Sequence, residues 1–284
     1  MRVLLTNDDG VDAPGLAALV RAADLWARRG DGDVPREVVV VAPDRNHSGA
    51  GASVGEVYRR RGVAYRRHRF ADAPGVDAYA LDASPALCVL VGVLGGLGAR
   101  PDVVLSGVNA GVNVGRSVLH SGTVGAILTA SQLGLSGIAV SMQWVEGAPF
   151  DVAATLAVGL LGVVAEAPAR TLLNLNVPAL DPGELRGVRR GRISTAGIVK
   201  AAGDGAGAAP LADEGEIPLR LGSAVPSLGD VSDEGPEDDG ALVAAGFASL
   251  TPLRSVHEAA GDGDDDAVRA ALEALGEHLA GVRD

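Results

Sequence analysis

The chain has 284 residues, of which 47% are hydrophobic and 3% aromatic, so it can bury a large core made mainly of Val, Leu and Ala. Its formal net charge of −12 argues against a nucleic-acid groove, which needs a basic surface. The apolar stretches fall short of a membrane span of about 18 residues, and no secretory signal is visible. We therefore expect a cytoplasmic protein whose single cysteine, Cys88, is a buried thiol.

The first apolar run, Val3 to Leu5, ends abruptly in Asn7-Asp8-Asp9-Gly10, and a helical pattern follows Pro14. The pattern predicts a strand, a loop and a helix. Ligands of open α/β sheets bind beyond the carboxyl ends of the strands. Adjacent carboxylates repel each other unless a cation lies between them, and oxygen ligands suit Mg²⁺ or Mn²⁺. The alternative is an ordinary acidic turn, because Asn, Asp and Gly are common turn residues.

Helical and strand patterns alternate along the next hundred residues. Apolar spacing predicts a helix over 16–27, and a Val-rich run predicts a buried strand over 37–42. The chain from 54 to 80 is irregular, and six arginines crowd 59–69, which we interpret as a solvated hairpin-like excursion over about 56–70. Ser84-Pro85 begins a helix that is predicted to reach Leu97, and 102–105 is the next predicted strand.

That strand leads into a predicted loop over 106–115, in which glycines alternate with asparagines. Small residues let backbone amides approach an anion closely, although such a loop can also be only a permissive connection. A helix predicted from His120 to Leu133 would direct its free amides at this loop. The sequence therefore predicts a phosphate-binding region. His120 itself is equally well explained as a helix cap or a packed ring.

The rest of the chain divides at about residue 193. Strands are predicted over 137–141 and 172–177, with a helix over 152–165 between them. Residues 194–240 show no sustained periodicity and are too many for an ordinary connection within a compact domain. A last strand is predicted over 247–252 and a terminal amphipathic helix over 266–282. We therefore expect a core over 1–193 and, over 194–284, an extended arm with the last strand and the terminal helix.

Six short motifs together resemble the SurE family of survival proteins, which are metal-dependent 5′/3′-nucleotidases. In chain order they are Thr6-Asn7-Asp8-Asp9-Gly10, Val41-Ala42-Pro43-Asp44-Arg45 with Ser48-Gly49, Ser106-Gly107-Val108-Asn109 with Gly111 and Asn113, His120-Ser121-Gly122-Thr123-Val124, Leu173-Asn174-Leu175-Asn176-Val177-Pro178 and Ser249-Leu250-Thr251-Pro252-Leu253. The resemblance implies an α/β fold with a Rossmann-like, three-layer, mostly parallel sheet. It also implies a C-terminal extension used in oligomerisation, with a homodimer or tetramer that exchanges its C-terminal arms.

The resemblance further implies one divalent metal ion per subunit, Mg²⁺ or Mn²⁺. The expected ligands are Asp8, Asp9, Ser48 and Asn109, of which Asp8, Asp9 and Asn109 are also the expected catalytic residues. Asp9 would orient or deprotonate a metal-bound water. The expected phosphate and substrate contacts are Asn7, Ser106, Gly107, Asn113, His120, Ser121, Gly122 and Thr123. An aspartyl-phosphate mechanism is disfavoured, because Asp8-Asp9-Gly10 lacks the spacing of aspartate-nucleophile phosphatases.

The expected reaction is hydrolysis of nucleoside 5′-monophosphates to nucleoside and phosphate, with 3′-monophosphates, polyphosphate and base preference left open. A noncatalytic nucleotide-binding or sensing protein on the same fold is the alternative, and it would retain ligand without turnover. A dinucleotide-dependent oxidoreductase is disfavoured, because no Gly-x-Gly-x-x-Gly follows the first strand. Three places depart from the family pattern: Leu87 replaces a common acidic residue, residues 49–53 are rich in glycine, and Phe247 replaces a usual Tyr. The first two bear on substrate preference.

Overall fold

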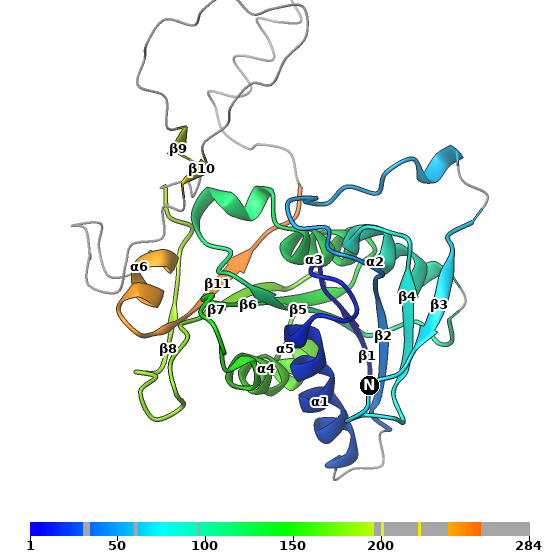
Figure 1. The fold of residues 1–284 in the computed structure, drawn as a ribbon, viewed down its shortest axis with the longest axis horizontal. Helices are drawn as coiled ribbons and strands as arrows, with labels where there is room; N and C mark the ends of the chain where they lie inside the picture. Colours follow the sequence, from blue (N-terminus) through cyan, green and yellow to red (C-terminus); the bar gives the residue numbers. More distant parts are fainter. Residues whose placement is uncertain are drawn as a thin grey trace, which may run out of the picture. The chain divides into compact units, whose positions relative to one another are not determined.

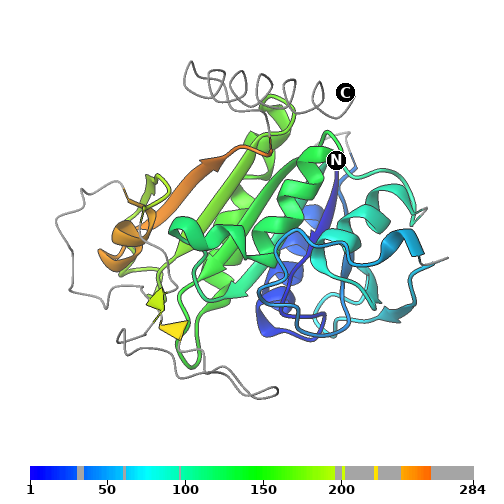
Figure 2. The same ribbon diagram turned by 90° about the horizontal axis from the view of Figure 1, so that it is seen from above.

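The protein, described here from a computed structural model, is an α/β fold in which helices cover both faces of one large sheet (Figures 1 and 2). The structure describes residues 1–30, 35–59, 62–95, 97–195, 200–201, 221–222 and 238–256. Residues Met1–Leu253 form one compact unit and Arg254–Asp284 form a second. The predicted fold class, a three-layer α/β fold with a mostly parallel sheet, is confirmed.

The large sheet has nine strands in the order β3-β4-β2-β1-β5-β6-β7-β11-β8. Its parallel centre consists of β4 (Asp77–Leu81), β2 (Glu37–Pro43), β1 (Arg2–Thr6), β5 (Val103–Ala110), β6 (Ser136–Met142) and β7 (Leu172–Val177). At one edge β3 (Tyr65–His68) is antiparallel to β4. At the other edge β11 (Ala248–Leu253) is antiparallel to β7 and parallel to β8 (Val188–Arg190). A separate antiparallel pair joins β9 (Lys200–Ala201) and β10 (Leu221–Gly222).

Helices form a layer on each face of the large sheet (Figure 1). On one face lie α1 (Pro14–Arg28), α4 (Phe150–Gly159) and α5 (Leu161–Glu166), and on the other lie α2 (Pro85–Leu94) and α3 (Gly122–Gln132). Two 3₁₀ turns, η1 (Val57–Arg59) and η2 (Gly115–Leu119), and a short helix, α6 (Asp239–Ala244), complete the described elements. No helix among the described residues is both long enough and apolar enough to cross a bilayer.

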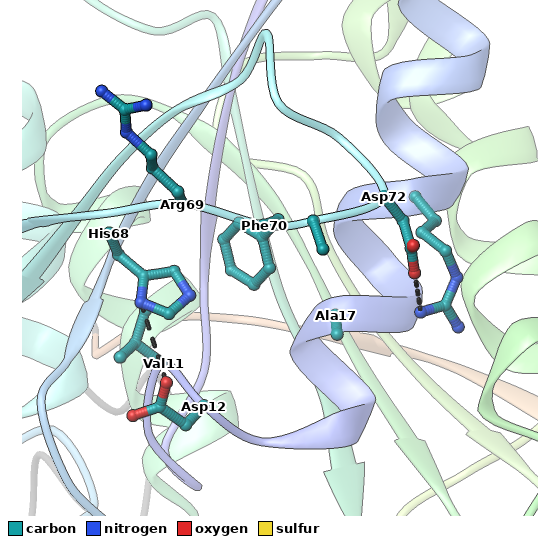
Figure 3. Close-up of a pocket in the computed structure, with 9 residues that line it drawn as sticks. Val11, Asp12, Ala17, His68, Arg69, Phe70 and Asp72 are labelled. Carbon is teal, nitrogen blue, oxygen red and sulfur yellow. Dashed lines mark ion pairs between the residues drawn. The ribbon is translucent and has the colours of Figure 1, made fainter.

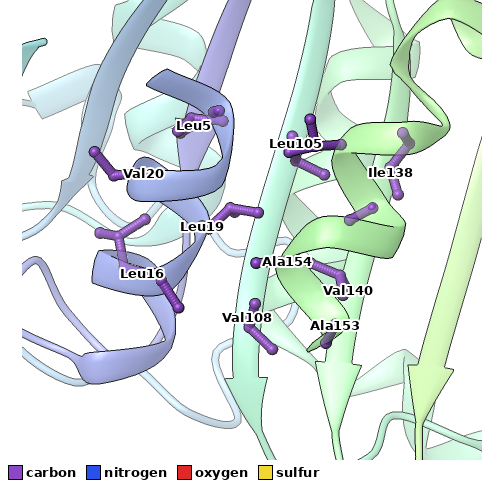
Figure 4. Packing of buried hydrophobic residues seen from close by; sticks show 14 of the residues in the cluster. Leu5, Leu16, Leu19, Val20, Leu105, Val108, Ile138, Val140, Ala153 and Ala154 are labelled. Carbon is purple, nitrogen blue, oxygen red and sulfur yellow. The ribbon is translucent and has the colours of Figure 1, made fainter. Parts of the chain in front are cut away.

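An apolar layer on each face of the sheet explains why these segments fold together. Beneath α1 and α4, side chains such as Leu16, Leu105 and Ala154 are completely buried, and Figure 4 shows them interlocking between helix and strands. Leu4 and Ile127 are equally buried beneath α2 and α3. The central strands are therefore apolar on both sides, as parallel strands covered by two helical layers require.

The strand order places the predicted site at a switch point of the sheet. From β1 the chain continues to β2 on one side, and from β5 it continues to β6 on the other. Neighbouring connections that leave in opposite directions open a crevice beyond the carboxyl ends of the strands. Asp8 and Asp9 follow β1, and Asn109 lies near the end of β5. The topology therefore brings these three residues to one crevice.

Several element boundaries differ from the sequence-based expectations. Strand β5 continues to Ala110 through part of the predicted loop over 106–115, and its register with β6 is irregular between Ser106 and Asn109. Strand β4 lies inside the stretch over 54–80 that was expected to be irregular. Leu160 separates α4 from α5 within the predicted helix over 152–165. Helix α2 ends at Leu94 rather than Leu97, with Gly95 as its C-cap.

Other expectations are confirmed or lie outside the described residues. The arginine-rich excursion does form a hairpin with β4, but β3 is an edge strand of the large sheet. The last strand is present as β11 between β7 and β8, within the unit Met1–Leu253. The short elements β8 and α6 were not predicted, because three and six residues are too few for a periodic pattern. The predicted terminal helix over 266–282 and most of 194–240 lie outside the described residues.

Candidate functional site

The acid loop, residues 7–10, is a tight turn at the carboxyl end of β1. Asn7 Nδ2 donates to Gly10 O at 2.8 Å and closes the turn. Gly10 has a φ of +101°, and an added Cβ would lie 2.9 Å from the carbonyl carbon of Arg45. No other residue fits easily there, because both the dihedral angle and the space favour glycine. The backbone thereby fixes Asp8, which is 3% exposed, beside the half-buried Asp9.

Burial makes the ionised forms of both carboxylates unfavourable. Burial raises the pKa of Asp8, and the charge of Asp9 raises it further. A hydrogen bond of 2.5 Å from Thr123 Oγ1 lowers the same pKa but does not cancel the effect of burial. Burial also raises the pKa of Asp9, against hydrogen bonds from the Ala110 amide, at 3.1 Å, and the Ser48 hydroxyl. A cation between the carboxylates would favour their ionised forms.

Neutral polar groups from two other loops gather around Asp9. The Ser48 hydroxyl lies close enough to Asp9 to lower the pKa of this carboxyl, and Asn46 Nδ2 lies 3.4 Å from Asp9 Oδ1. Asn109 precedes the Ala110 amide, and its own Nδ2 donates to Gly111 O at 2.6 Å, which fixes its amide group. The structure thus places three predicted metal ligands together and the fourth, Asn109, beside them.

This set of groups fits a hard cation. Carboxylate, hydroxyl and amide oxygens are the ligands that Mg²⁺ and Mn²⁺ prefer. The described residues contain no group of three or more His, Cys, Asp or Glu side chains arranged to hold a metal. A metal at the acid loop would therefore depend on neutral oxygens in addition to Asp8 and Asp9.

The N-terminus of α3 lies against Asp8. Ser121 Oγ caps the helix by accepting from Val124 N at 3.1 Å. An added Cβ on Gly122 would lie 2.7 Å from Asp8 Cβ, so only glycine allows this approach. The positive end of the helix dipole therefore faces the crevice, where an anion would be stabilised. His120, just before the helix, is exposed, and its carbonyl oxygen accepts from Gly51 N at 3.0 Å.

Other predicted phosphate contacts are involved in packing. Asn113 Nδ2 donates to Ser141 Oγ at 2.8 Å, so its side chain is directed toward β6. Ser106 is completely buried in β5, and an added Cβ on Gly107 would lie 2.2 Å from Val140 O. These three residues face the interior of the fold rather than the crevice.

Two pockets lie near the acid loop. One, of about 180 Å³, is lined by Arg45 and His47 after β2 and by Ser84 and Leu87 at the start of α2. His47 N donates to Asp8 O at 2.7 Å, so this pocket adjoins the acid loop. Leu87 is 4% exposed and donates its amide to the N-cap Ser84 Oγ at 3.3 Å. The position that lacks the family's acidic residue is therefore both a helix-capping position and part of the pocket wall.

The second pocket, of about 240 Å³, lies on the α1 side and is shown in Figure 3. Its carboxylates face cationic or titratable partners: Asp12 lies 3.7 Å from His68 Nδ1, and Asp72 lies 3.6 Å from Arg21. Because both carboxylates of this pocket already face such partners, the pocket is a weaker candidate site for a cation than the acid loop.

Comparison with known proteins agrees with this geometry. A family model described as survival protein SurE matches residues 3–199. The chain belongs to the SurE family. It is 38% identical over 256 residues to a 5′/3′-nucleotidase SurE of Cronobacter sakazakii, covering 89% of this chain and 90% of that protein, and 36% identical over the same length to one of Klebsiella pneumoniae. The solved structure of the SurE protein of Aquifex aeolicus matches with a TM-score of 0.68 and 28% identity, covering 96% of this chain and 100% of that one.

Some residues at the site of this SurE chain were missed by sequence reasoning. Asn46 reaches Asp9 from the loop after β2, where it resembles any turn asparagine. Ala110 acts through its backbone amide, which leaves no side-chain signal. Asp239 bonds to Gly115 N across 124 residues of sequence, a contact that no local pattern predicts.

Proposed function

We propose that this SurE protein is a divalent-metal-dependent nucleotidase that hydrolyses nucleoside 5′-monophosphates, and 3′-monophosphates as well, to nucleoside and phosphate. The relatives named 5′/3′-nucleotidase SurE, which align over 90% of their length, support this activity. The observation that carries the proposal is the meeting of Asp8 and Asp9 with the start of α3 at the switch point of the sheet. Carboxylates for a cation and the positive end of a helix dipole for an anion thus lie in one crevice.

Asp8, Asp9, Ser48 and Asn109 would hold Mg²⁺ or Mn²⁺. When bound, this ion polarises the phosphoryl group and lowers the pKa of the attacking water. Asp8 is the more buried carboxylate and is fixed by Thr123, so we assign it to ion binding. Asp9 is more accessible, and we assign it the orientation of water and the acceptance of its proton.

The chain's own donors would hold the substrate phosphate. The amides of Gly122 and Thr123, with the Ser121 cap behind them, face the crevice and would bind nonbridging oxygens. His120 is exposed at the crevice end of α3 and would donate a proton to the leaving oxygen or bind phosphate. We assign Asn7 to shaping the acid loop and Ser106, Gly107 and Asn113 to its surroundings, without direct contact with phosphate.

A metal-by-substrate screen tests the function. The purified protein is treated with EDTA, and phosphate release is measured from AMP, GMP, CMP, UMP and 3′-AMP with Mg²⁺, Mn²⁺ or no added ion. We expect turnover only with an added ion. Tight nucleotide binding without phosphate release would instead identify a noncatalytic binding protein, and release that is unaffected by EDTA would contradict metal dependence.

We also propose a homodimer or tetramer in which arms after about residue 193 are exchanged between subunits in the cytoplasm. Exchange of an identical element is a low-cost route to assembly. The support is the length of the aperiodic stretch over 194–240 and the family resemblance. Light scattering at micromolar concentration tests this, and a monomer mass would contradict it.

A further inference from the structure

The asparagine loop, residues 109–115, carries no charged side chain, yet its backbone is held by side chains from distant parts of the chain. Asn113 N donates to Asn176 Oδ1 at 2.7 Å. The Asn113 carbonyl oxygen accepts from Asn174 Nδ2 at 2.8 Å and from Asn176 Nδ2 at 3.1 Å. Asn176 therefore binds both the donor and the acceptor of one peptide residue, 63 positions away in sequence.

Asp239 holds the end of the same loop. Its carboxylate is completely buried and accepts from Gly115 N at distances of 2.9 and 3.1 Å to its two oxygens. The same carboxylate accepts from Ser194 N at 3.3 Å and Gly240 N at 2.8 Å. Burial raises the pKa of Asp239 despite these three amides. A buried carboxylate is unfavourable for folding unless it makes such bonds.

The opposite end of the loop is bonded to Asp9. Ala110 N donates to Asp9 Oδ2 at 3.1 Å, and Asn109 is its immediate neighbour. Gly111 N donates to Met142 O at 2.8 Å. The loop is thus fixed at Asp9, at β6, and at the two residues that Asn176 and Asp239 hold. A shift at Asn113 or Gly115 would be transmitted through a few peptide units to Asn109.

The surroundings of Asn176 argue against a purely stabilising role. Asn174 Oδ1 on the same strand, and Ser249 Oγ and Thr251 Oγ1 on the neighbouring strand β11, are buried without a hydrogen-bond partner among the described residues. Such atoms lower stability, and an apolar replacement of the same shape is often neutral or better. In this polar region, the hydrogen bonds of Asn176 and Asp239 converge on the asparagine loop.

We propose that Asn176 and Asp239 are positioning residues, which hold the asparagine loop so that Asn109 and the Ala110 amide keep their places beside Asp9. This inference rests on the proposed nucleotidase function. It assigns a role to the Asn174-Leu175-Asn176 motif and to Asp239, neither of which lies in the acid loop.

Asn176→Ala tests the proposal against Thr251→Val as a matched control. Thr251 is on an adjacent strand and is 2% exposed, but its hydroxyl makes no hydrogen bond to any residue that the structure describes. With Mn²⁺ and AMP, we expect kcat of Asn176→Ala to fall by up to about tenfold, because displacing Asn109 should cost no more than removing its side chain, and KM to change much less. Thr251→Val should keep wild-type kcat and KM. Asp239→Asn, which retains one acceptor oxygen, should keep more activity than Asp239→Ala.

Hydrogen exchange of the full-length protein measures how firmly Asn176 and Asp239 hold the asparagine loop, without the need for turnover. In Asn176→Ala, the amides of Asn113 and Gly115 should exchange at least about tenfold faster than in wild type, while amides in the centre of β1 keep their rates. Unchanged exchange at Asn113, or a kcat equal to wild type, overturns the proposal. An inactive wild type would refute the nucleotidase function, and the exchange rates would still decide whether Asn176 holds the asparagine loop.

Discussion

The acid loop and the asparagine loop meet at one edge of the sheet but are stabilised in different ways. The acid loop carries two mutually repelling carboxylates, the buried Asp8 and the half-buried Asp9, and is fixed by its own turn and by Thr123. The asparagine loop has no charge and is fixed by side chains from β6, β7 and α6. In the proposed mechanism, the reactive groups are thus separated in sequence from the groups that position them. Substitutions in the two loops should therefore have different effects.

Substitution of the carboxylates should have the largest effect. We expect Asp8→Asn and Asp9→Asn each to lower kcat by about 100- to 1000-fold, because each removes a charge that serves the cation and the transition state. Phosphate release from AMP with Mg²⁺ or Mn²⁺ measures this. Both variants should remain folded by circular dichroism, since a large Val and Leu core does not need an ion for stability. Wild-type turnover by Asp9→Asn would support an ordinary acidic turn.

Gly122→Ala tests how closely α3 approaches the acid loop. The added methyl would lie 2.7 Å from Asp8 Cβ and 2.9 Å from Asp8 Oδ2. We expect the free energy of unfolding, measured by urea denaturation, to fall by about 1–3 kcal/mol, and kcat to be lower than in the control variant. Gly159→Ala is the control, because Gly159 lies in α4 and an added Cβ would have no atom within 4 Å from the described residues outside its own helix turn. Equal stability of both variants would refute the close approach.

Asn109→Ala should have a smaller effect than either aspartate substitution. It removes a neutral group that water can partly replace. We expect a fall in kcat/KM of about tenfold, which corresponds to ~1.4 kcal/mol, and a higher Mn²⁺ concentration for half-maximal activity. A Mn²⁺ titration of AMP hydrolysis measures both. A loss as large as that of Asp9→Asn would show that the two loops are equally important for catalysis.

Leu87→Asp should have the smallest effect on rate and a selective effect on substrate. Leu87 lines the pocket beside the acid loop, so a carboxylate there should change the ranking of AMP, GMP, CMP and UMP by less than about tenfold. Leu94→Asp makes the same change at the far end of α2, where Leu94 is 69% exposed, and should leave the ranking unchanged. An unaltered ranking in Leu87→Asp would limit this position to helix capping.

Much of the sheet was predictable because its signals are local. The Val-rich run of β2 and the abrupt end of β1 at Asn7 specify buried parallel strands without other information. The pairing of β4 with β2 and β3 was not predictable in this way, because the apolar run over 78–81 is short and follows an arginine-rich stretch. Asp239 illustrates the same limit, since its three amide donors come from separate parts of the chain.

Local sequence patterns also do not predict which face of the sheet each helix covers. The connections β5-α3-β6 and β6-α4-α5-β7 both join adjacent parallel strands in the same direction across the sheet, yet their helices lie on opposite faces. They must therefore have opposite handedness. Because about 98% of such crossovers are right-handed, the usual rule would have placed α3 and α4 on the same face. Here α4 instead packs against α1.

The Asp239 carboxylate also joins, by hydrogen bonds, two parts of the backbone that are far apart in sequence. It accepts from Ser194 N and Gly240 N, so the two ends of the intervening segment are fixed at one point within the compact unit. The entropy lost on closing a flexible loop grows only with the logarithm of its length, and a doubling costs about 0.6 kcal/mol. Insertions between these ends should therefore leave the sheet and the acid loop almost unaffected. A longer segment or an added module between these ends should therefore leave the geometry of the acid loop unchanged.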